Sequence, residues 1–299
     1  MTNSHRLDHQ PFVVPPGKKI QLKDHATDFT AGFTDKKSAE RALLEDVSEL
    51  VEAQNLLWAS KEYSLIILFQ ALDAAGKDGT IKHVMSGVNP QGVNVHSFKA
   101  PSEEERLHHF LCRPMRVLPA RGMIAIFNRS YYEEVLVVRV HPEFLDKQWL
   151  PHEFRTKDLD RLWRARYDEI NAFEKAMSDQ NICFLKFFLN ISKGEQRKRF
   201  LERLDNPAKN WKFSIADLRE RSFWNEYQQA YEDMLNATST EWAPWHIIPA
   251  DKKWFARACV ADIITNRISK LDLKLPAVSP ETQAAFTEAR QTLEAEVND

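Results

Sequence analysis

The sequence predicts a three-layer α/β fold with a mostly parallel five-stranded sheet. Five β-prone segments alternate with helical patterns: residues 64–71, 93–99, 123–128, 182–189 and 245–249. Several of them are continuous apolar runs, and the fourth is interrupted only by Lys186. Such runs are typical of parallel strands covered on both faces, and the alternation predicts right-handed crossovers. Ligands of such sheets bind at the carboxyl ends of the strands.

The two ends of the chain lie outside this alternation. Residues 1–35 are polar and aperiodic, and we expect an N-terminal arm that runs over the surface. Apolar positions recur at helical spacing over 36–60 and predict the first helix of a domain that covers 36–275. Prolines then interrupt the chain, and we expect 276–299 to form a peripheral C-terminal helix.

Two helical stretches separate the last three strands. An apolar stripe over 159–177 has helical spacing and predicts a helix that faces the core. Residues 191–236 are charged and helical, with interruptions at Asn206-Pro207 and before Ser214. A basic, hinged segment before the last strand is a candidate helical lid.

Composition and charge exclude several classes of partner. The 299 residues are 43% hydrophobic and 28% charged with a net charge of −2, which gives no general attraction to nucleic acid or an anionic membrane. No segment has the apolar length needed to cross a bilayer or to form a signal peptide. The three cysteines are far apart in the sequence. We therefore expect a cytoplasmic protein with free thiols.

The stretch Ser64–Val84 carries the strongest functional signal. An apolar strand ends in a small-residue turn, followed by Gly76-Lys77 and a helix-like segment. Backbone N–H groups at such a helix start, and the positive end of its dipole, face a bound anion. We expect Lys77 to contact the terminal phosphates of a chain or a nucleotide. The small residues expected around these phosphates are Ala74, Ala75 and Gly76.

This loop departs from the phosphate-binding pattern G-x-x-x-x-G-K-[ST] at two positions. Ala71 replaces the first glycine, and Asp78 replaces the hydroxyl residue that normally binds magnesium. Asp73 supplies a second carboxylate, which is a natural oxygen ligand for a hard cation. Asp73 is therefore the candidate metal ligand. For Asp78 we favour capping of the helix N-terminus over a metal contact.

A second group of candidates follows the strand 123–128. P-loop enzymes normally deliver an acid to magnesium from this strand end, but here the position is Asn128. Arg129 follows it, and a guanidinium can grip two phosphate oxygens, although an ordinary ion pair is the alternative. Glu133 and Glu134 come one turn later. One of them could bind a nucleotide or a metal, and the other is then a surface charge.

The candidate lid carries a basic set that could neutralise an extended polyanion. Its members are Lys193, Arg197, Lys198, Arg199, Arg203, Lys209, Lys212, Arg219 and Arg221. A charge run is more often a solvated helical face, and interleaved glutamates support that interpretation for some members. Lys209 and Lys212, on either side of Trp211, are the best placed, and Arg197 and Arg203 are weaker candidates.

Four ordered motifs closely resemble polyphosphate kinase family 2. They are ALDAAGKDGTIKHVMSGVNPQGV (71–93), IFNRSYYEEVLVVRV (126–140), FFLNISKGEQRKRFLERLDNPAKNWKF (187–213) and PWHIIPADKKWFAR (244–257). The resemblance extends over about 34–272. It implies a P-loop kinase fold with a helical lid, and magnesium-dependent transfer of a phosphoryl group between inorganic polyphosphate and a nucleotide.

The resemblance also assigns roles to residues at matching positions. The residues that match the Walker A motif are Asp73, Gly76, Lys77, Asp78, Gly79 and Thr80. The residues that match the polyphosphate-binding lid are Lys209, Lys212 and Arg221. The implied cofactor is Mg²⁺, with Mn²⁺ as a substitute, and the implied assembly is a homo-oligomer, either a dimer or a tetramer.

Two departures from most family members concern the nucleotide. Asn128 replaces the Walker B aspartate, and Glu133 stands where those members carry asparagine. Both departures resemble the class III pattern of the family, which acts on AMP as well as ADP. We therefore expect Asn128 and Glu133 to lie at the nucleotide.

The expected function is reversible transfer of phosphoryl groups from polyphosphate to AMP and ADP, with guanine nucleotides as further candidates. Asp73, Lys77 and Arg129 are the expected catalytic residues. One alternative is a polyphosphate kinase restricted to ADP. An ATP-dependent nucleoside monophosphate kinase is disfavoured by the altered loop. A non-catalytic binder of polyphosphate or nucleic acid is disfavoured by the net charge and by the metal-capable loop.

Overall fold

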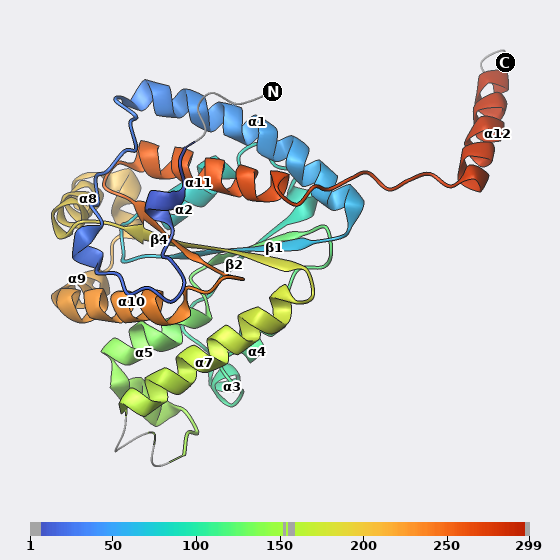
Figure 1. The fold of residues 1–299 in the computed structure, drawn as a ribbon. Coiled ribbons are helices and arrows are strands. Elements are labelled where there is room, and N and C mark those ends of the chain that lie inside the picture. Colours follow the sequence, from blue (N-terminus) through green and yellow to red (C-terminus); the bar gives the residue numbers. More distant parts are fainter. Residues whose placement is uncertain (1–6, 152–153, 155–158, 297–299) are drawn as a thin grey trace.

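The structure is a computed structural model that describes residues 7–151, 154 and 159–296. Residues 1–6 of the expected arm and 297–299 of the expected C-terminal helix lie outside this description. The described chain has helices on both sides of one sheet, which is the predicted three-layer α/β arrangement (Figure 1).

The five predicted strands are confirmed. They are β1 (Ser64–Gln70), β2 (Val93–Ser97), β3 (Ile124–Asn128), β4 (Ile182–Asn190) and β5 (Trp245–Pro249). Their order in the sheet is β2-β3-β1-β4-β5, and all four pairings are parallel. The central strand is therefore β1, and its carboxyl end leads directly into the glycine-containing loop.

Each face of the sheet carries its own helices and its own apolar core (Figure 1). The helices of one face are α1 (Lys36–Ser60), α2 (Lys77–Val84) and α11 (Lys253–Ser269). The helices of the other face are α5 (Val137–Val140), α7 (Leu159–Ser178) and α10 (Trp224–Thr238). The predicted core-facing helix over 159–177 is α7, and the predicted helix over 36–60 is α1. No described helix is both long enough and apolar enough to pass through a bilayer.

Shorter elements complete the fold. They are α3 (Glu103–Arg106), α4 (Cys112–Met115), and the 3₁₀ segments Gln10–Phe12, Leu22–Asp24, Pro90–Gly92, Tyr131–Val135, Pro142–Lys147 and Pro207–Lys212. The 3₁₀ segment Tyr131–Val135 follows β3 closely and brings Glu133 beside Arg129.

The N-terminal arm is partly built into the core instead of only running over the surface. Phe12 and Val14 are buried, with exposed fractions of 1% and 0%. Val14 N donates to Trp245 O at 2.9 Å, and Val13 forms an antiparallel bridge with His246. The arm therefore covers the free edge of β5, which would otherwise present unpaired backbone groups to solvent.

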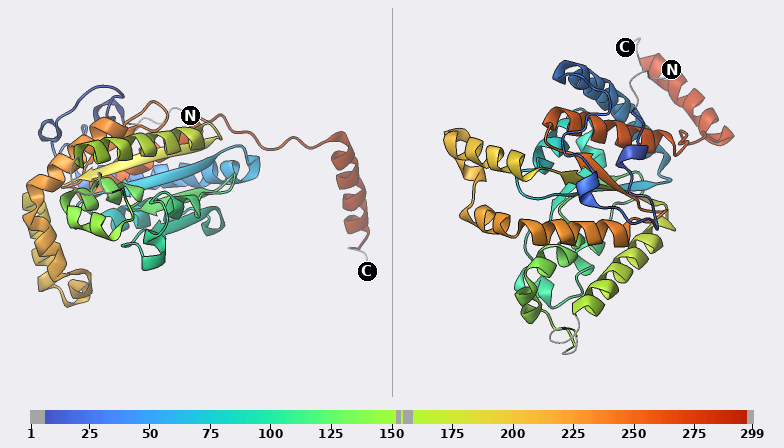
Figure 2. Two further views of the ribbon diagram at one scale, coloured as in Figure 1. Left: turned by 90° about the horizontal axis from the view of Figure 1, so that it is seen from below. Right: turned by 60° about the vertical axis from the view of Figure 1, so that its left-hand side comes forward.

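The segment 191–236 divides into two parts with different packing. α8 (Lys193–Asp205) and α9 (Ile215–Ser222) project beyond the sheet in Figure 2, and α9 has no buried residue. α10, in contrast, buries Tyr231, Met234 and Leu235 in the core of the second face. The C-terminal helix α12 (Pro280–Glu296) has no buried residue and stands clear of the body in Figure 1.

A buried polar network crosses the second face of the sheet. Lys186 of β4 is 0% exposed, and its Nζ donates to Glu174 Oε2 at 2.7 Å, to Tyr132 Oη at 2.8 Å and to Thr238 O at 2.7 Å. The hydroxyls of Tyr131 and Tyr132 both donate to Glu174 Oε1 at 2.7 Å. Burial lowers the pKa of Lys186 and raises those of both tyrosines. Lys186, the charged residue within the apolar run of β4, therefore has hydrogen-bond partners for its ammonium group in the core.

Stability is expected to fall in mild acid because of His246 on β5. Its ring is 6% exposed and lies against Phe187, and burial lowers its pKa to about 4. Between pH 6.5 and pH 4 the unfolded chain therefore binds a proton that the native protein does not, so lowering the pH destabilises the fold. Because of this one group, the free energy of unfolding is expected to fall by about 2 kcal/mol between pH 7 and pH 5.

Urea unfolding at pH 7 and pH 5 tests this expectation with the native protein and the His246→Gln variant. Gln is neutral at both pH values, so the variant should lose about 2 kcal/mol less than the native protein on acidification. The same pH dependence in both proteins would show that His246 is not responsible.

Candidate active site at the carboxyl ends of the strands

The loop between β1 and α2 has the predicted order of strand, loop and helix. β1 ends at Gln70, and α2 begins at Lys77. Gly76 is the N-cap of α2 with a φ of 111°, a left-handed conformation that glycine adopts without a Cβ clash. Ala74 also has a positive φ, of 63°, which costs energy for a residue with a Cβ. The surroundings of the loop must therefore hold it in this conformation.

Lys77 folds back over the loop that precedes it. Its Nζ donates to Ala71 O at 2.8 Å. Burial, together with the nearby charge of Arg129, lowers the pKa of Lys77. An ammonium group with little hydration attracts a phosphate more strongly than an exposed one because the interaction is less screened.

Arg129 joins two carboxylates at the ends of β1 and β3. Its Nη2 lies 3.1 Å from Asp73 Oδ1, and its Nη1 lies 3.6 Å from Glu133 Oε2. The backbone of Arg129 has a φ of 62°, and its N–H donates to Phe69 O at 3.1 Å. The charge of Glu133 raises the pKa of Arg129, while burial raises the pKa of Glu133. The structure thus brings three of the predicted residues into direct contact.

Asp78 does not cap α2, contrary to the interpretation that we favoured from the sequence. The N-cap is Gly76, and no side chain forms a capping hydrogen bond there. The Asp78 carboxylate instead accepts a hydrogen bond from Asn128 Nδ2 at 2.7 Å. Asp78 lies in the first turn of α2 and Asn128 is the last residue of β3, so a tertiary contact between helix and strand decided the orientation of the carboxylate.

Arg199 of α8 holds the backbone of the loop. Its side chain is 3% exposed, and Nη1 donates to Ala74 O at 3.0 Å and Ala75 O at 2.8 Å. Nη2 donates to Ala250 O at 2.6 Å and Asp251 O at 3.0 Å. One guanidinium therefore joins the strained loop to the segment after β5. The sequence placed Arg199 in the basic set of the lid without indicating that it is buried.

A second contact from α8 reaches the candidate metal ligand. Gln196 Nε2 donates to Asp73 O at 2.9 Å, and Gln196 Oε1 accepts from Arg221 Nη1 at 2.6 Å. Arg221 also donates to Lys193 O at 3.0 Å. Arg221 is not among the described residues that line the cleft at the carboxyl ends of the strands, which the next paragraph describes. Its side chain joins α9 to α8, so the structure does not place this predicted polyphosphate ligand with the others.

These residues line one cleft of about 760 Å³ at the carboxyl ends of the strands. Among the described residues that line it, nine are lysines or arginines and four are acidic. The cations are Lys77, Lys99, Arg129, Arg199, Arg203, Lys209, Lys212, Lys253 and Arg257, and the acids are Asp73, Asp78, Glu202 and Asp217. The whole chain carries a net charge of −2, so positive charge is concentrated here. The cleft is therefore suited to a polyanion.

Most of the predicted site residues line this cleft, and a few do not. Those that line it, besides the charged groups, are Ala74, Ala75, Gly76, Gly79, Thr80 and Asn128. Glu133 lies behind Arg129 and is not part of the described lining. Arg221 is also absent from the described lining. The other members of the basic set that are absent from it are Lys193, Arg197, Lys198 and Arg219.

Three cations that line the cleft were not predicted from the sequence: Lys99, Lys253 and Arg257. Lys99 follows β2 and Lys253 follows β5, so both lie beyond strand ends, which is the position that identified Asp73 and Arg129. Arg257 lies one turn further along α11, and a Cβ on Gly79 would sit 3.5 Å from its Nη2. This distance is an ordinary van der Waals contact, so the guanidinium of Arg257 lies directly beside the first turn of α2. The motif containing Lys253 and Arg257 was visible in the sequence, but its side chains had no assigned role.

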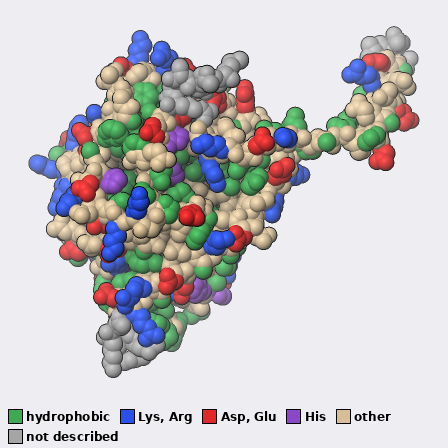
Figure 3. Space-filling view, in the orientation of Figure 1, with side chains coloured by type: hydrophobic (Ala, Val, Ile, Leu, Met, Phe, Trp, Pro, Cys, Tyr) green, Lys and Arg blue, Asp and Glu red, His purple; other side chains and the backbone are tan. Residues whose placement is uncertain are grey.

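The outer wall of the cleft comes from the segment between α8 and α9. Trp211 is 78% exposed, and Lys212 Nζ lies 4.9 Å from the centre of its ring. Arg203 Nη1 lies 3.5 Å from Asp217 Oδ2 and ties the two helices together. In Figure 3, lysine and arginine side chains recur along the edge of the molecule where these helices lie. Positive charge is thus carried by a part of the chain with little burial.

Comparisons with known proteins agree with this geometry. The family model described as Polyphosphate kinase 2 (PPK2) matches residues 33–276. The chain is 44% identical to the ADP-polyphosphate phosphotransferase of Rhodopseudomonas palustris, over 96% of this chain and 99% of that protein. It is 42% identical to the AMP/ADP-polyphosphate phosphotransferase of Meiothermus ruber, over 91% of this chain and 96% of that protein.

A solved structure extends the similarity to three dimensions. The crystal structure of polyphosphate kinase 2 from Arthrobacter aurescens matches with a TM-score of 0.82 at 36% sequence identity. The match covers 94% of this chain and 99% of that one. The family model, the two relatives and the shared fold all extend over nearly the whole described chain. This protein therefore belongs to the polyphosphate kinase 2 family.

Proposed function

We propose that this protein transfers phosphoryl groups reversibly from inorganic polyphosphate to AMP and ADP, forming ADP and ATP. The observation that carries the proposal is the concentration of nine cations around the glycine-containing loop of a chain whose net charge is −2. A nucleotide alone does not need cations spread from Lys77 to Lys212, whereas an extended phosphate chain does.

The names of the relatives support the same substrates. One is named for ADP and polyphosphate, and the other for AMP, ADP and polyphosphate. Asn128 and Glu133 resemble the class III pattern of the family, and this resemblance supports AMP as an acceptor in addition to ADP. Restriction to ADP remains the second candidate because the relative from Rhodopseudomonas palustris is named for ADP only.

The residues of the cleft fit a divalent ion at Asp73. Arg129 donates to Asp73 Oδ1, and no described residue donates a hydrogen bond to Oδ2, which leaves an oxygen for a cation. Among the described residues no group of three or more His, Cys, Asp and Glu side chains could enclose a metal. This donor set suits Mg²⁺, or Mn²⁺, because Mg²⁺ takes most of its ligands from water and substrate phosphates. When bound, the ion would neutralise charge on the reacting phosphates.

The chain itself supplies positioning and positive charge. The acceptor is already an anionic phosphate oxygen, so transfer needs no strong general base. Lys77 and Arg129 would stabilise charge on the transferred group, and the N–H groups at the start of α2 would hold its oxygens. Arg199 and Gln196 hold the backbone of the loop in place for this task. Fixed geometry of this kind can account for most of the acceleration.

We further propose that, within the expected lid 191–236, the outer segment 206–222 is the part that closes, because Gln196 and Arg199 of α8 are bound to the loop. α9 has no buried residue, and the hydrogen bonds of Arg221 and the ion pair of Arg203 with Asp217 attach it to α8. Closing over a bound chain would bring Lys209 and Lys212 onto its phosphates and exclude water. Consistent with the family, we propose a cytoplasmic enzyme that assembles as a dimer or a tetramer.

One assay tests the proposal directly. The protein is incubated with AMP, Mg²⁺ and polyphosphate without ATP, and the products are separated by chromatography. ADP followed by ATP is expected, and parallel reactions with ADP, GMP and GDP would define the acceptor. Product from ADP but not from AMP would restrict the function to ADP. No product from any acceptor would overturn the proposal in favour of a binding protein or an ATP-dependent kinase.

A further inference from the structure

Gln70 places a buried amide at the point where the central strand meets the candidate active site. It is the last residue of β1, which leads into the loop around Lys77, and it is 0% exposed. The five residues before it in the strand are all apolar. A buried amide is costly unless its donor and its acceptor both have partners, so the partners of Gln70 indicate its role.

The neighbours of Gln70 decide which way its amide points. Ser130 N, a donor, lies on one side, and the Glu133 carboxylate, an acceptor, lies on the other. With its oxygen toward Ser130, Gln70 accepts hydrogen bonds from Ser130 N at 3.2 Å and from Ser130 Oγ at 3.1 Å. Gln70 Nε2 then donates to Glu133 Oε1 at 3.0 Å. The opposite orientation would place the amide oxygen against a carboxylate, so the first one satisfies the amide.

The hydrogen bond from Gln70 holds one oxygen of a carboxylate whose other oxygen faces Arg129. Arg129 Nη1 lies 3.6 Å from Glu133 Oε2, which is close enough for an ion pair but too long for a hydrogen bond. The Glu133 side chain is 26% exposed, so packing does not enclose it. Among the described residues, no other side chain donates a hydrogen bond to this carboxylate. Gln70 therefore supplies the directional contact that orients Glu133.

The oriented carboxylate in turn helps to hold Arg129. The Arg129 side chain is 44% exposed, and its second nitrogen, Nη2, lies 3.1 Å from Asp73 Oδ1. A long, partly exposed side chain loses much conformational freedom when it is fixed, so two carboxylates are needed to hold it in one place. A guanidinium that is fixed before the substrate arrives needs little rearrangement during the reaction.

We propose that Gln70 is a positioning residue, which acts through Glu133 to hold Arg129 at the transferred phosphoryl group. This inference rests on the proposed transfer reaction and adds a residue that is not among the described residues lining the cleft. Loss of the amide should lower kcat, because Arg129 acts on the transferred group. The KM for polyphosphate should stay the same, because Lys209 and Lys212 are untouched.

Initial rates of the variant Gln70→Met, with AMP, Mg²⁺ and varied polyphosphate, test the proposal. Met has a similar volume but cannot donate to Glu133. We expect kcat to fall at least about tenfold while the KM for polyphosphate stays within about twofold of the native value. Gln70→Asn, whose amide is one methylene too short to reach both partners, should show the same division between kcat and KM. Thermal unfolding establishes that each variant is folded at the assay temperature.

A double variant distinguishes positioning through Glu133 from a general defect at the end of β1. In the Glu133→Ala background the amide has no carboxylate to orient. Gln70→Met should therefore lower kcat by less than about a further twofold in that background. A general defect would instead reduce the rate independently of Glu133, and the two losses would multiply.

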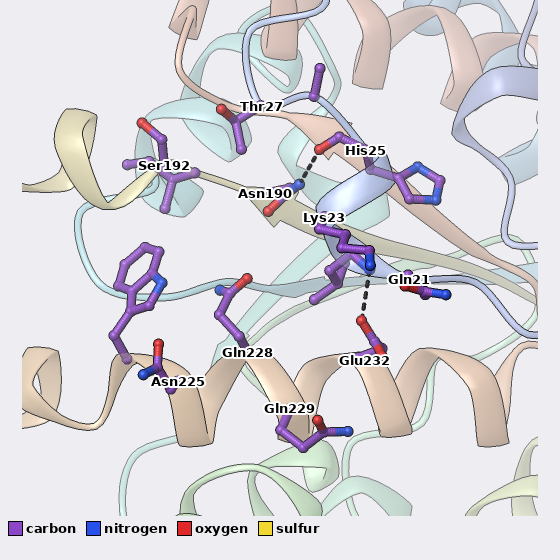
Figure 4. A pocket seen from close by; sticks show the side chains of 14 residues that line it. Gln21, Lys23, His25, Thr27, Asn190, Ser192, Asn225, Gln228, Gln229 and Glu232 are labelled. Carbon is purple, nitrogen blue, oxygen red and sulfur yellow. Dashed lines mark hydrogen bonds between the residues drawn. The ribbon is translucent and has the colours of Figure 1, made fainter.

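The matched control comes from a second cavity, of about 590 Å³, beside α10 (Figure 4). Its walls are the arm over 21–27, the residues 190–192 after β4, and one side of α10, and it shares no described lining residue with the cleft around Lys77. Gln228 of α10 lines this cavity, and its Nε2 is buried without a hydrogen-bond partner among the described residues. Gln228→Met makes the same substitution away from Glu133 and should leave kcat within about twofold of the native value.

The outcomes separate this proposal from the transfer reaction on which it rests. Native-like kcat in Gln70→Met, an equal loss in Gln228→Met, or multiplied losses in the double variant would overturn the role of Gln70 and leave the reaction in place. A raised KM for polyphosphate with unchanged kcat would also overturn it. No transfer by the native protein would overturn the proposed function and this role together.

Discussion

Replacing Lys77 with alanine is expected to lower kcat for phosphoryl transfer by about 10²–10³-fold. The ammonium group lies at the start of α2, is largely desolvated, and is held by Ala71 O. It is therefore fixed before the substrate arrives, and it acts in surroundings where a charge is weakly screened. Loss of a preorganised cation removes stabilisation of the charge that develops on the transferred group.

The matched control for this experiment is Lys82→Ala on the same helix. Lys82 is exposed, and it is not among the described residues that line the cleft around Lys77 or the cavity beside α10. Its removal should leave kcat within about twofold of the native value, and both variants should keep the native melting temperature to within a few degrees. Initial rates with polyphosphate, AMP and Mg²⁺ supply the measurement. Native-like turnover in Lys77→Ala would show that this lysine has no catalytic role.

Replacing Lys186 with methionine is expected to lower the free energy of unfolding by about 3–5 kcal/mol. Met keeps most of the volume of the side chain but removes the cation that pairs with Glu174 in the core. The glutamate is itself 0% exposed, so the variant leaves a buried carboxylate whose remaining hydrogen bonds, among the described residues, come from two tyrosine hydroxyls. An uncompensated charge in the core is more damaging than the loss of one hydrogen bond.

Urea unfolding of two further variants makes this expectation specific. Lys175 on α7 is exposed and pairs with Asp179. Lys175→Met should lower the free energy of unfolding by less than about 1 kcal/mol. The double variant Lys186→Met/Glu174→Gln should recover part of the loss, because a neutral amide still accepts hydrogen bonds from the tyrosines. A cost for Lys186→Met as small as that of Lys175→Met would contradict a structural role for the buried pair.

The strands were predictable because their signal is local. The apolar runs of β1, β3, β4 and β5 correspond to buried strands, since a parallel strand between two layers of helices must be apolar on both sides. The edge strand β2 is mostly exposed and was predicted from its β-prone residues. Lys186 was the exception within β4. Its partners Glu174 and Thr238 lie 12 and 52 residues away in the sequence, so no local pattern indicated that this charge is satisfied in the core.

The candidate site was predictable to a similar degree. The Gly76-Lys77 turn and the Asn128-Arg129 strand end could be read as motifs because each is contiguous. Arg199 could not, because it acts on Ala75 from 124 residues further along the chain. The repeated pattern of basic residues in its helix does not distinguish a buried arginine from a solvated one.

The orientation of individual side chains was the least predictable feature. Asp78 has the position of a capping residue, yet it accepts a hydrogen bond from Asn128 on the neighbouring strand. Arg221 belongs to a basic run that resembles the family's lid, yet its guanidinium contacts Gln196 and Lys193. In both residues a partner brought close by folding competed with the role implied by sequence position.

The sequence by itself determined the strand–loop–helix order around Gly76, the acid and base at Asp73 and Lys77, and the parallel sheet that brings strand ends together. These features depend on hydrophobic periodicity and on short motifs, which act within a few residues. Only the tertiary structure decided that Arg199 holds the loop, that nine cations converge on one cleft, and that a second cavity lies between the N-terminal arm, the end of β4 and α10. Those features depend on packing between distant segments, whose geometry local sequence preferences do not encode.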